Sequence, residues 1–134
     1  MTSPAAAAGY MQKADRALDE ARLLLREKKT EGTCNRAYYA MHDAAHAALL
    51  ATGHQASGAI IKTHHNLIAE FGKKLVLGGL LDAAFGRAFN KVQDMRLLAD
   101  YSSEPPPLAE AQWAVEQAEA FVAAIGSLIE RRKP

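Results

Sequence analysis

The chain has one cysteine, almost no net charge and no long apolar run, and each scarcity excludes a class of protein. A single cysteine, Cys34, cannot form an internal disulfide, which is typical of a reducing cytoplasmic setting. Sixteen Lys and Arg against fifteen Asp and Glu leave a formal net charge of +1, so no global basic field indicates nucleic acid or a membrane surface. No apolar run approaches the length of a membrane span. We therefore expect a cytoplasmic protein without membrane contact, in which any anion site is local.

The length of 134 residues suits one domain, with about two thirds of its surface buried on folding. Residues 1–9 lack the charged start of a secretory signal, so we expect a disordered or extended lead-in there. The folded helical domain is expected over residues 10–131.

Apolar residues recur every three or four positions in five stretches, and no strand-like alternation competes with this pattern. The five expected helices begin near Tyr10, Thr33, Thr63, Leu81 and Pro107. The hydroxyls and the glycine of residues 30–33 (Thr-Glu-Gly-Thr) supply a stop for the first helix and a plausible N-cap for the second. Three consecutive prolines, residues 105–107, separate the last two helices because proline lacks an amide donor. Short connections favour antiparallel neighbours, so we predict an all-α, up-and-down bundle of about five helices.

The second expected helix has inward-facing residues on two sides, which is typical of a central helix or of one that also packs on a second subunit. Its second stripe consists of Asn35, Tyr39, His42 and His46. We expect this stripe to take part in self-association.

Within that stripe, the segment His42-Asp43-Ala44-Ala45-His46 is similar to a zinc-protease motif with Asp in place of Glu. Asp is one methylene shorter than Glu, and no third ligand has an obvious spacing. We therefore interpret the histidines as packed or interface residues and expect neither a metal nor a cofactor. Cys34 is interpreted as a small buried hydrophobe.

The end of the fourth expected helix breaks local rules. Arg96 and Asp100 share a face, but Arg before Asp is the weaker orientation, and an Asp in the last turn opposes the helix dipole. Such breaks are expected at functional or strained sites, so Arg96, Asp100 and Tyr101 form the candidate site. Two interpretations stay open: a structural ion pair, or an arginine that faces a phosphate and is held by Asp100.

Three segments of the chain resemble the HEPN domain (higher eukaryotes and prokaryotes nucleotide-binding), in particular its short single-domain prokaryotic branch. They are residues 35–41 (Asn-Arg-Ala-Tyr-Tyr-Ala-Met), 63–68 (Thr-His-His-Asn-Leu-Ile) with 70–73 (Glu-Phe-Gly-Lys), and 96–101 (Arg-Leu-Leu-Ala-Asp-Tyr). The resemblance runs from about Tyr10 to Ile129. It implies a HEPN-like helical bundle that forms a homodimer and is often encoded beside a minimal nucleotidyltransferase, as toxin and antitoxin.

The resemblance also implies an activity, because many HEPN members are metal-independent ribonucleases. Their motif is an Arg, four to six intervening residues and a His, brought together from two subunits in a dimer cleft. Carried onto this chain the arginine is Arg96, but the position after four intervening residues is Tyr101, and the last histidine is His65. Arg36 and His42 have the spacing, yet they lie six apart within one helix and should face different directions, so we set them aside.

Metal-free RNA cleavage needs a base for the 2′-hydroxyl proton and cationic donors for the charge on the phosphate. Arg96 can supply the donors. Tyr101, with a reference pKa near 10, is a poor base, and pairing with Arg moves Asp100 further from that task. His64 would have to supply the base from another helix.

Two functions therefore remain open. The first is a HEPN-type, toxin-like dimer whose cleft binds RNA or nucleotide phosphate, with metal-independent endoribonuclease activity and a nucleotidyltransferase antitoxin as partner. The alternative is a non-catalytic helical module that docks the nucleotidyltransferase, with Arg96 and Asp100 as an internal strut. The missing histidine and the near-zero net charge favour the alternative.

Overall fold

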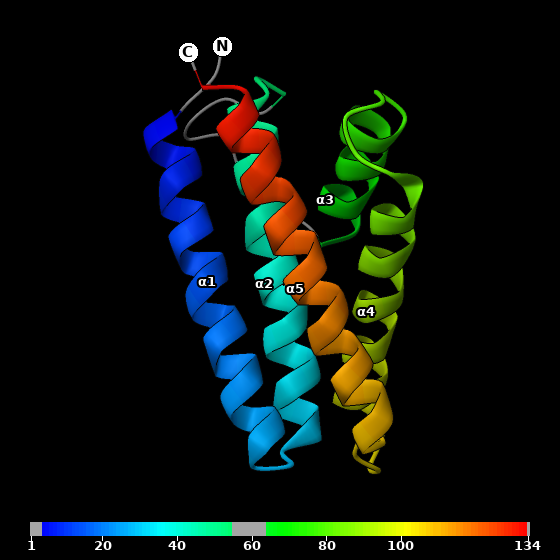
Figure 1. The fold of residues 1–134 in the computed structure, drawn as a ribbon. Helices are drawn as coiled ribbons and strands as arrows, with labels where there is room; N and C mark the ends of the chain where they lie inside the picture. Colours follow the sequence, from blue (N-terminus) through cyan, green and yellow to red (C-terminus); the bar gives the residue numbers. More distant parts are fainter. Residues whose placement is uncertain (1–3, 55–63, 134) are drawn as a thin grey trace.

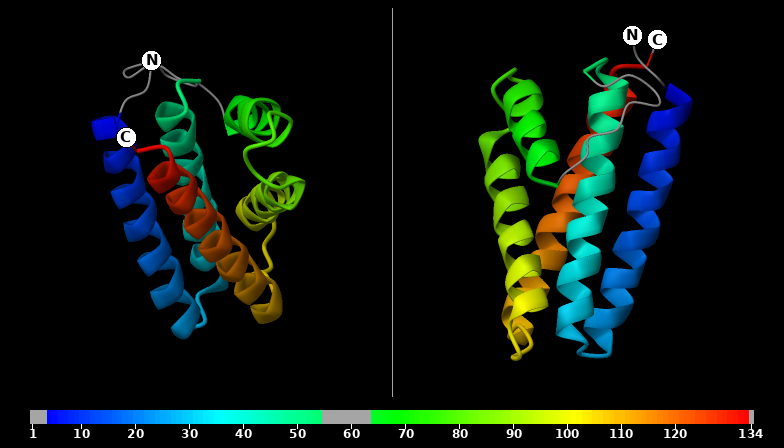
Figure 2. Two further views of the ribbon diagram at one scale, coloured as in Figure 1. Left: turned by 45° about the horizontal axis from the view of Figure 1, so that its top comes forward. Right: turned by 180° about the vertical axis from the view of Figure 1, so that it is seen from behind.

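The computed structural model describes residues 4–54 and 64–133, and over these ranges the chain is all-α (Figure 1). The helices are α1 (Pro4–Arg26), α2 (Thr30–Ala51), α3 (His64–Phe71), α4 (Ala83–Tyr101) and α5 (Leu108–Arg131), and α3 continues into a short π-helix, η1 (Gly72–Val76). The four long helices alternate in direction, so α1 begins and α5 ends at the same end of the bundle (Figures 1 and 2). The predicted helical bundle is confirmed.

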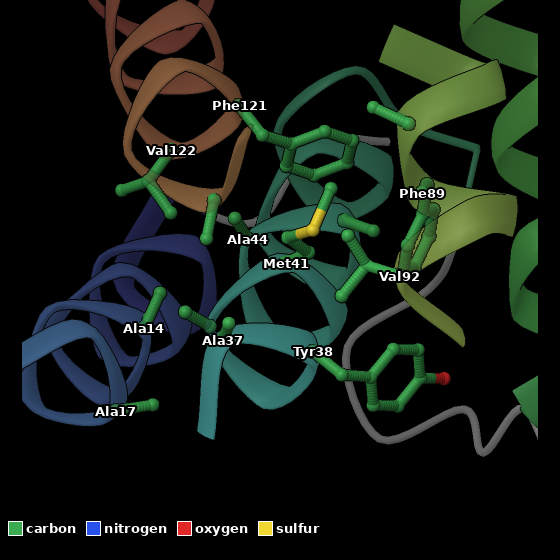
Figure 3. Packing of buried hydrophobic residues seen from close by; sticks show 14 of the residues in the cluster. Ala14, Ala17, Ala37, Tyr38, Met41, Ala44, Phe89, Val92, Phe121 and Val122 are labelled. Atoms are coloured by element: carbon green, nitrogen blue, oxygen red, sulfur yellow. The ribbon is translucent and has the colours of Figure 1, made fainter. Parts of the chain in front are cut away.

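The central element is α2, as its two inward stripes predicted. It packs against α1, α3, α4 and α5. Toward α1 the contact consists of alanines such as Ala14, Ala17 and Ala37, whose small side chains let the two backbones approach closely (Figure 3). Toward α4 and α5 the core is filled by large side chains.

The large core residues are fully buried and come from four helices. They include Tyr38, Met41, Phe71, Phe89 and Phe121. Full burial of one such apolar side chain contributes about 1.5–3 kcal/mol. Three of the phenylalanines also meet at ring-centroid distances of 5.0–5.6 Å, which fixes α3, α4 and α5 around one aromatic centre.

The start of α1 differs from the sequence-based expectation. The lead-in expected over residues 1–9 is helical from Pro4 onward, where proline suits the first turn of a helix. Alanine has the highest helix propensity, and Ala7 is buried with Ala47 and Leu50 of α2. The alanine run thus belongs to the bundle because it has a surface to pack against.

The turn between α1 and α2 also corrects an expectation, since Thr33 does not cap α2. The helix begins three residues earlier, and the Thr33 hydroxyl donates a hydrogen bond to the carbonyl oxygen of Lys29 at 2.8 Å. Lys28, with φ of +58°, reverses the chain in the left-handed conformation that commonly ends helices. The tight turn sets α1 and α2 antiparallel.

The end of α4 matches its sequence signals. The helix stops at Tyr101, and α5 begins at Leu108 directly after the three prolines. At the other end of α4, the Asp82 side chain accepts a hydrogen bond from the Ala84 amide at 2.8 Å and caps the helix. Among the described helices, none has the length and apolarity needed to cross a membrane.

Candidate functional site

Arg96 projects from the last part of α4 onto α2. Its guanidinium carbon lies 4.9 Å from the ring centroid of Tyr38 and 5.8 Å from that of Tyr39. Nε donates to Oε1 of Gln93 at 3.0 Å, and Nη1 donates to Oδ2 of Asp100 at 3.3 Å. The side chain is only 12% exposed. The expected pairing of Arg96 with Asp100 is therefore present, and two tyrosine rings that the sequence did not reveal orient the guanidinium.

Tyr38 is the fixed base of this site. It is fully buried, stacks on Phe89 with a centroid distance of 5.9 Å, and meets the Tyr39 ring edge-on at 5.3 Å. Burial raises the pKa of Tyr38, and the positive charge of Arg96 opposes that rise. Tyr38 therefore remains a neutral phenol at physiological pH. Its ring face attracts the guanidinium through a cation–π interaction of about 0.5–2 kcal/mol.

Asp100 and Tyr101 lie at the solvent-exposed end of α4. The Asp100 side chain is 48% exposed, so its ion pair with Arg96 is of the weak, solvent-screened kind. Tyr101 is 86% exposed, and Leu98, one turn earlier, is 68% exposed. The structure thus brings Arg96 and Asp100 together and leaves Tyr101 facing solvent, which suits contact with another molecule.

His64, the base expected from another helix, is the first residue of α3. Its side chain lies outside the described residues, so its proposed role stays a prediction. The helix itself packs against α2 and α4.

His42 lies closer to this site than its sequence position indicated. Its ring is 5.8 Å from that of Tyr38 and 5.5 Å from that of Tyr39, and its Nδ1 is 3.3 Å from Oδ1 of Asp43. The Asp43 side chain is 4% exposed, and that of His42 is 20% exposed. A buried carboxylate beside an imidazole orients the ring, an arrangement suited to accepting a proton.

A model of the HEPN domain matches residues 7–129 of the chain. The chain belongs to the HEPN family. Three curated relatives match between 68% and 92% of this chain. The "UPF0332 protein" of Thermotoga maritima is 31% identical over 126 residues, which cover 92% of this chain and 91% of that protein. The "Putative toxin MJ0605" of Methanocaldococcus jannaschii is 32% identical over 109 residues, covering 81% and 78%. The "UPF0332 protein glr0978" of Gloeobacter violaceus is 33% identical over 91 residues, covering 68% of each chain.

In this HEPN chain, Arg36 and His42 meet at one ring although they are six residues apart. The guanidinium carbon of Arg36 lies 5.0 Å from the centroid of Tyr39, which is three residues from each of them. A large side chain midway between two positions can contact both, even where those positions face different directions. The spacing of Arg36 and His42 was the available signal for this shared contact, which two positions six apart on a helix do not by themselves predict.

Part of the stripe expected to mediate self-association packs against α1 within a single HEPN chain. His46 is 7% exposed and stacks on Tyr10 of α1 with ring centroids 5.0 Å apart. His42 and His46 also touch, at 4.8 Å. The two histidines are therefore packed residues, and α1 covers this part of the stripe because it runs past Tyr10 along α2. Within the described ranges, no group of three or more candidate metal ligands occurs.

A large cavity among the described residues lies away from Arg96. It measures about 720 Å³ and lies between the start of α1 and the end of α5, with Ala7, Met11 and Ile129 in its wall. A smaller pocket of about 270 Å³ borders the end of α4 and includes Leu98, Ala99 and the three prolines. Only the smaller pocket adjoins the helix end that carries the candidate site.

Proposed function

We propose that this HEPN protein is toxin-like and that Arg96, Asp100 and Tyr101 form a site for the phosphate of RNA or a nucleotide in a homodimer cleft. The observation that carries the proposal is the way in which Arg96 is held. Two tyrosine rings orient its guanidinium, while the only carboxylate paired with it among the described residues is the half-exposed Asp100. The name of the Methanocaldococcus relative supports the toxin-like part.

Phosphate can replace Asp100 at little cost. An exposed ion pair is worth about 0–1 kcal/mol, and the bond between Arg96 and Asp100 is long for a charge-assisted hydrogen bond at 3.3 Å. A guanidinium offers a planar fork that matches two phosphate oxygens, whereas Asp100 engages only Nη1. The rings keep that fork oriented during the exchange.

We further propose metal-independent cleavage, in which a base takes the 2′-hydroxyl proton and the 2′-oxygen attacks the adjacent phosphorus. The bond to the 5′-oxygen breaks, giving a 2′,3′-cyclic phosphate and a 5′-hydroxyl that takes its proton from water. Arg96 would stabilise the charge that develops on the phosphate. The base would be an imidazole, supplied by His42, which Asp43 orients beside the tyrosine rings, or by His64 of α3.

The homodimer is supported by exposed apolar residues at the end of α4, the helix that carries the site. Leu98 and Tyr101 are large, exposed and one turn apart at the end of α4. Exposed apolar residues in contact with one another commonly mark an interaction surface. In a two-fold dimer the same patch faces itself, so this contact would place the ends of the two α4 helices side by side.

The experiment measures binding of a fluorescent single-stranded RNA in the presence of a chelator, and cleavage of the same RNA on a gel. Arg96→Ala is expected to weaken binding at least tenfold, because a charge-assisted hydrogen bond contributes about 1.5–3 kcal/mol. The matched control is Arg22→Ala, which removes a guanidinium already paired with two carboxylates. Unchanged binding by a folded Arg96→Ala protein contradicts the proposal, and cleavage that survives the substitution removes Arg96 from the mechanism.

A second candidate function is a non-catalytic module that docks a nucleotidyltransferase. The low exposure of Arg96 favours it, since a guanidinium bound to Gln93 and Asp100 of its own helix can act as a strut. Expression in a bacterial host separates the two functions. Growth arrest relieved by Arg96→Ala supports the toxin, whereas harmless expression with a stably co-purifying nucleotidyltransferase supports the module.

A further inference from the structure

A polar groove of about 360 Å³ runs between α1 and α2, apart from the pocket at the end of α4. Its walls are formed by Lys13, Arg16, Ala17 and Glu20 of α1 and by Arg36, Tyr39 and Asp43 of α2. On each helix these residues follow the spacing of one face, and the two faces meet because α1 and α2 are antiparallel neighbours (Figure 1). The groove therefore has cations on both walls.

The carboxylates of the groove are already engaged. Oε1 of Glu20 lies 3.3 Å from Nη1 of Arg36, and Oδ1 of the buried Asp43 lies 3.3 Å from Nδ1 of His42. In the part of the chain that the structure describes, neither Lys13 nor Arg16 forms an ion pair. The lining of the groove thus has three cations, Lys13, Arg16 and Arg36, against two carboxylates, Glu20 and Asp43.

Tyr39 connects this groove to the Arg96 site. Its ring forms part of the groove wall, and the guanidinium carbons of Arg36 and Arg96 lie 5.0 Å and 5.8 Å from its centroid. Arg36 and Arg96 therefore both lie near the Tyr39 ring. Because Arg16 and Lys13 line the same groove as Tyr39, the groove places further cations near the Arg96 site.

We propose that the α1–α2 groove is a second phosphate subsite, which holds a phosphodiester of the same single-stranded RNA whose neighbouring phosphate binds Arg96. This inference rests on the proposed function. Proteins that bind single strands use a positively charged groove that follows the backbone. The two guanidinium groups suit the forked geometry of phosphate oxygens, and Lys13 adds a point charge. The Glu20 side chain is 56% exposed and can leave Arg36 when a phosphate arrives.

The test compares Lys13→Gln/Arg16→Gln with Lys73→Gln/Lys74→Gln, a control that removes the same charge from η1, on the side of α2 away from α1 (Figure 2). Binding of a short fluorescent single-stranded RNA is measured by anisotropy at several salt concentrations, in chelator. We expect the groove variant to bind at least fivefold more weakly and the control to stay within about twofold of wild type. Each lost phosphate contact should also reduce the magnitude of the slope of the log binding constant against log salt concentration by about 0.7.

The outcomes separate this inference from the function on which it rests. If Arg96→Ala weakens binding but the groove variant matches its control, the subsite is wrong and the Arg96 site stands. If the wild-type protein does not bind RNA, both proposals fall. If the groove variant loses binding to poly-glutamate as much as to RNA, the groove is a surface for acidic proteins and the RNA subsite is overturned.

Discussion

Two arginines in different parts of the bundle show how differently a protein can hold the same group. Arg22 joins α1 to α5: its Nε and Nη2 lie 2.9 Å and 2.8 Å from Oε2 of Glu119, and its Nη1 lies 3.1 Å from Oδ1 of Asp19. Arg96 lies over the ring of Tyr38 and has a single carboxylate, that of Asp100, at 3.3 Å. Two carboxylates contact the first guanidinium, whereas aromatic rings orient the second, which a single carboxylate contacts through one hydrogen bond.

The difference shows that the solvent exposure of an arginine side chain and the availability of its charge to another anion are separate properties. The Arg22 side chain is 42% exposed, yet hydrogen bonding to Glu119 raises its pKa and commits its charge. The Arg96 side chain is less exposed, but it has a single anionic partner in the described structure, whereas Arg22 has two. The less accessible arginine is therefore the better candidate for binding an anion. The following predictions test this contrast, from the largest expected effect to the smallest.

The contrast requires that the ring beneath Arg96 be a rigid part of the core. We expect Tyr38→Ala to lower the free energy of unfolding by about 3–5 kcal/mol, because it empties a fully buried position beside Phe89. Tyr101→Ala, at the exposed end of α4, should change it by no more than about 0.5 kcal/mol. Urea denaturation of both variants provides the measurement. Equal effects would show that the ring is not a fixed support.

A rigid support for the Tyr38 ring also requires that water be excluded from the core one helical turn before it, where Cys34 is buried. Burial, and to a lesser extent the charge of Glu110, raises the pKa of the Cys34 thiol from about 9 to about 11. The unfolded thiol ionises first, so the folded state retains more protons, and stability falls as pH rises from about 9 to about 11. This thiol should account for about 2–3 kcal/mol of that loss.

Urea denaturation of wild type and Cys34→Ala at about pH 8 and about pH 11 isolates the contribution of the thiol. The loss of stability between these pH values should be smaller in the variant, because alanine does not ionise. An identical loss in both proteins would mean that water reaches Cys34 in the folded state.

A third prediction concerns the exposed apolar residues at the end of α4. Leu98→Glu/Tyr101→Glu should raise the dissociation constant of the homodimer at least tenfold, about 1.4 kcal/mol, because two charges would enter the proposed contact. The matched control is Leu23→Glu/Leu77→Glu, which changes two other exposed leucine side chains, 50% and 84% exposed. Sedimentation equilibrium measures both. A wild-type monomer at micromolar concentration would remove the dimer from the proposal.

The smallest expected effect compares the two ion pairs directly. A double-mutant cycle should give a coupling energy of about 0.5–1 kcal/mol for Arg22 with Glu119, and less for Arg96 with Asp100, whose contact is longer and single. Both couplings should shrink when salt is added. A stronger coupling at Arg96 would support the strut, and with it the non-catalytic docking module.

Much of the fold followed from the spacing of apolar residues. Their recurrence at three and four positions predicted the helices, the two inward stripes of α2 predicted its central place, and the prolines at 105–107 predicted the end of α4. The start of α1 and the start of α2 were misplaced. Both helix starts depend on the burial of a small or polar residue, Ala7 or Thr33, against a neighbouring helix. The local spacing of apolar residues does not indicate that burial.

The sequence by itself determined that Arg96 and Asp100 share a face, because residues four apart on a helix are neighbours on its surface. Only the tertiary structure decided that Arg96 of α4 lies over Tyr38 and Tyr39 of α2. Contacts between α2 and α4 depend on how far the two helices slide and rotate against each other. That register is set by the packing of the whole core, to which each local stretch of sequence contributes only a part.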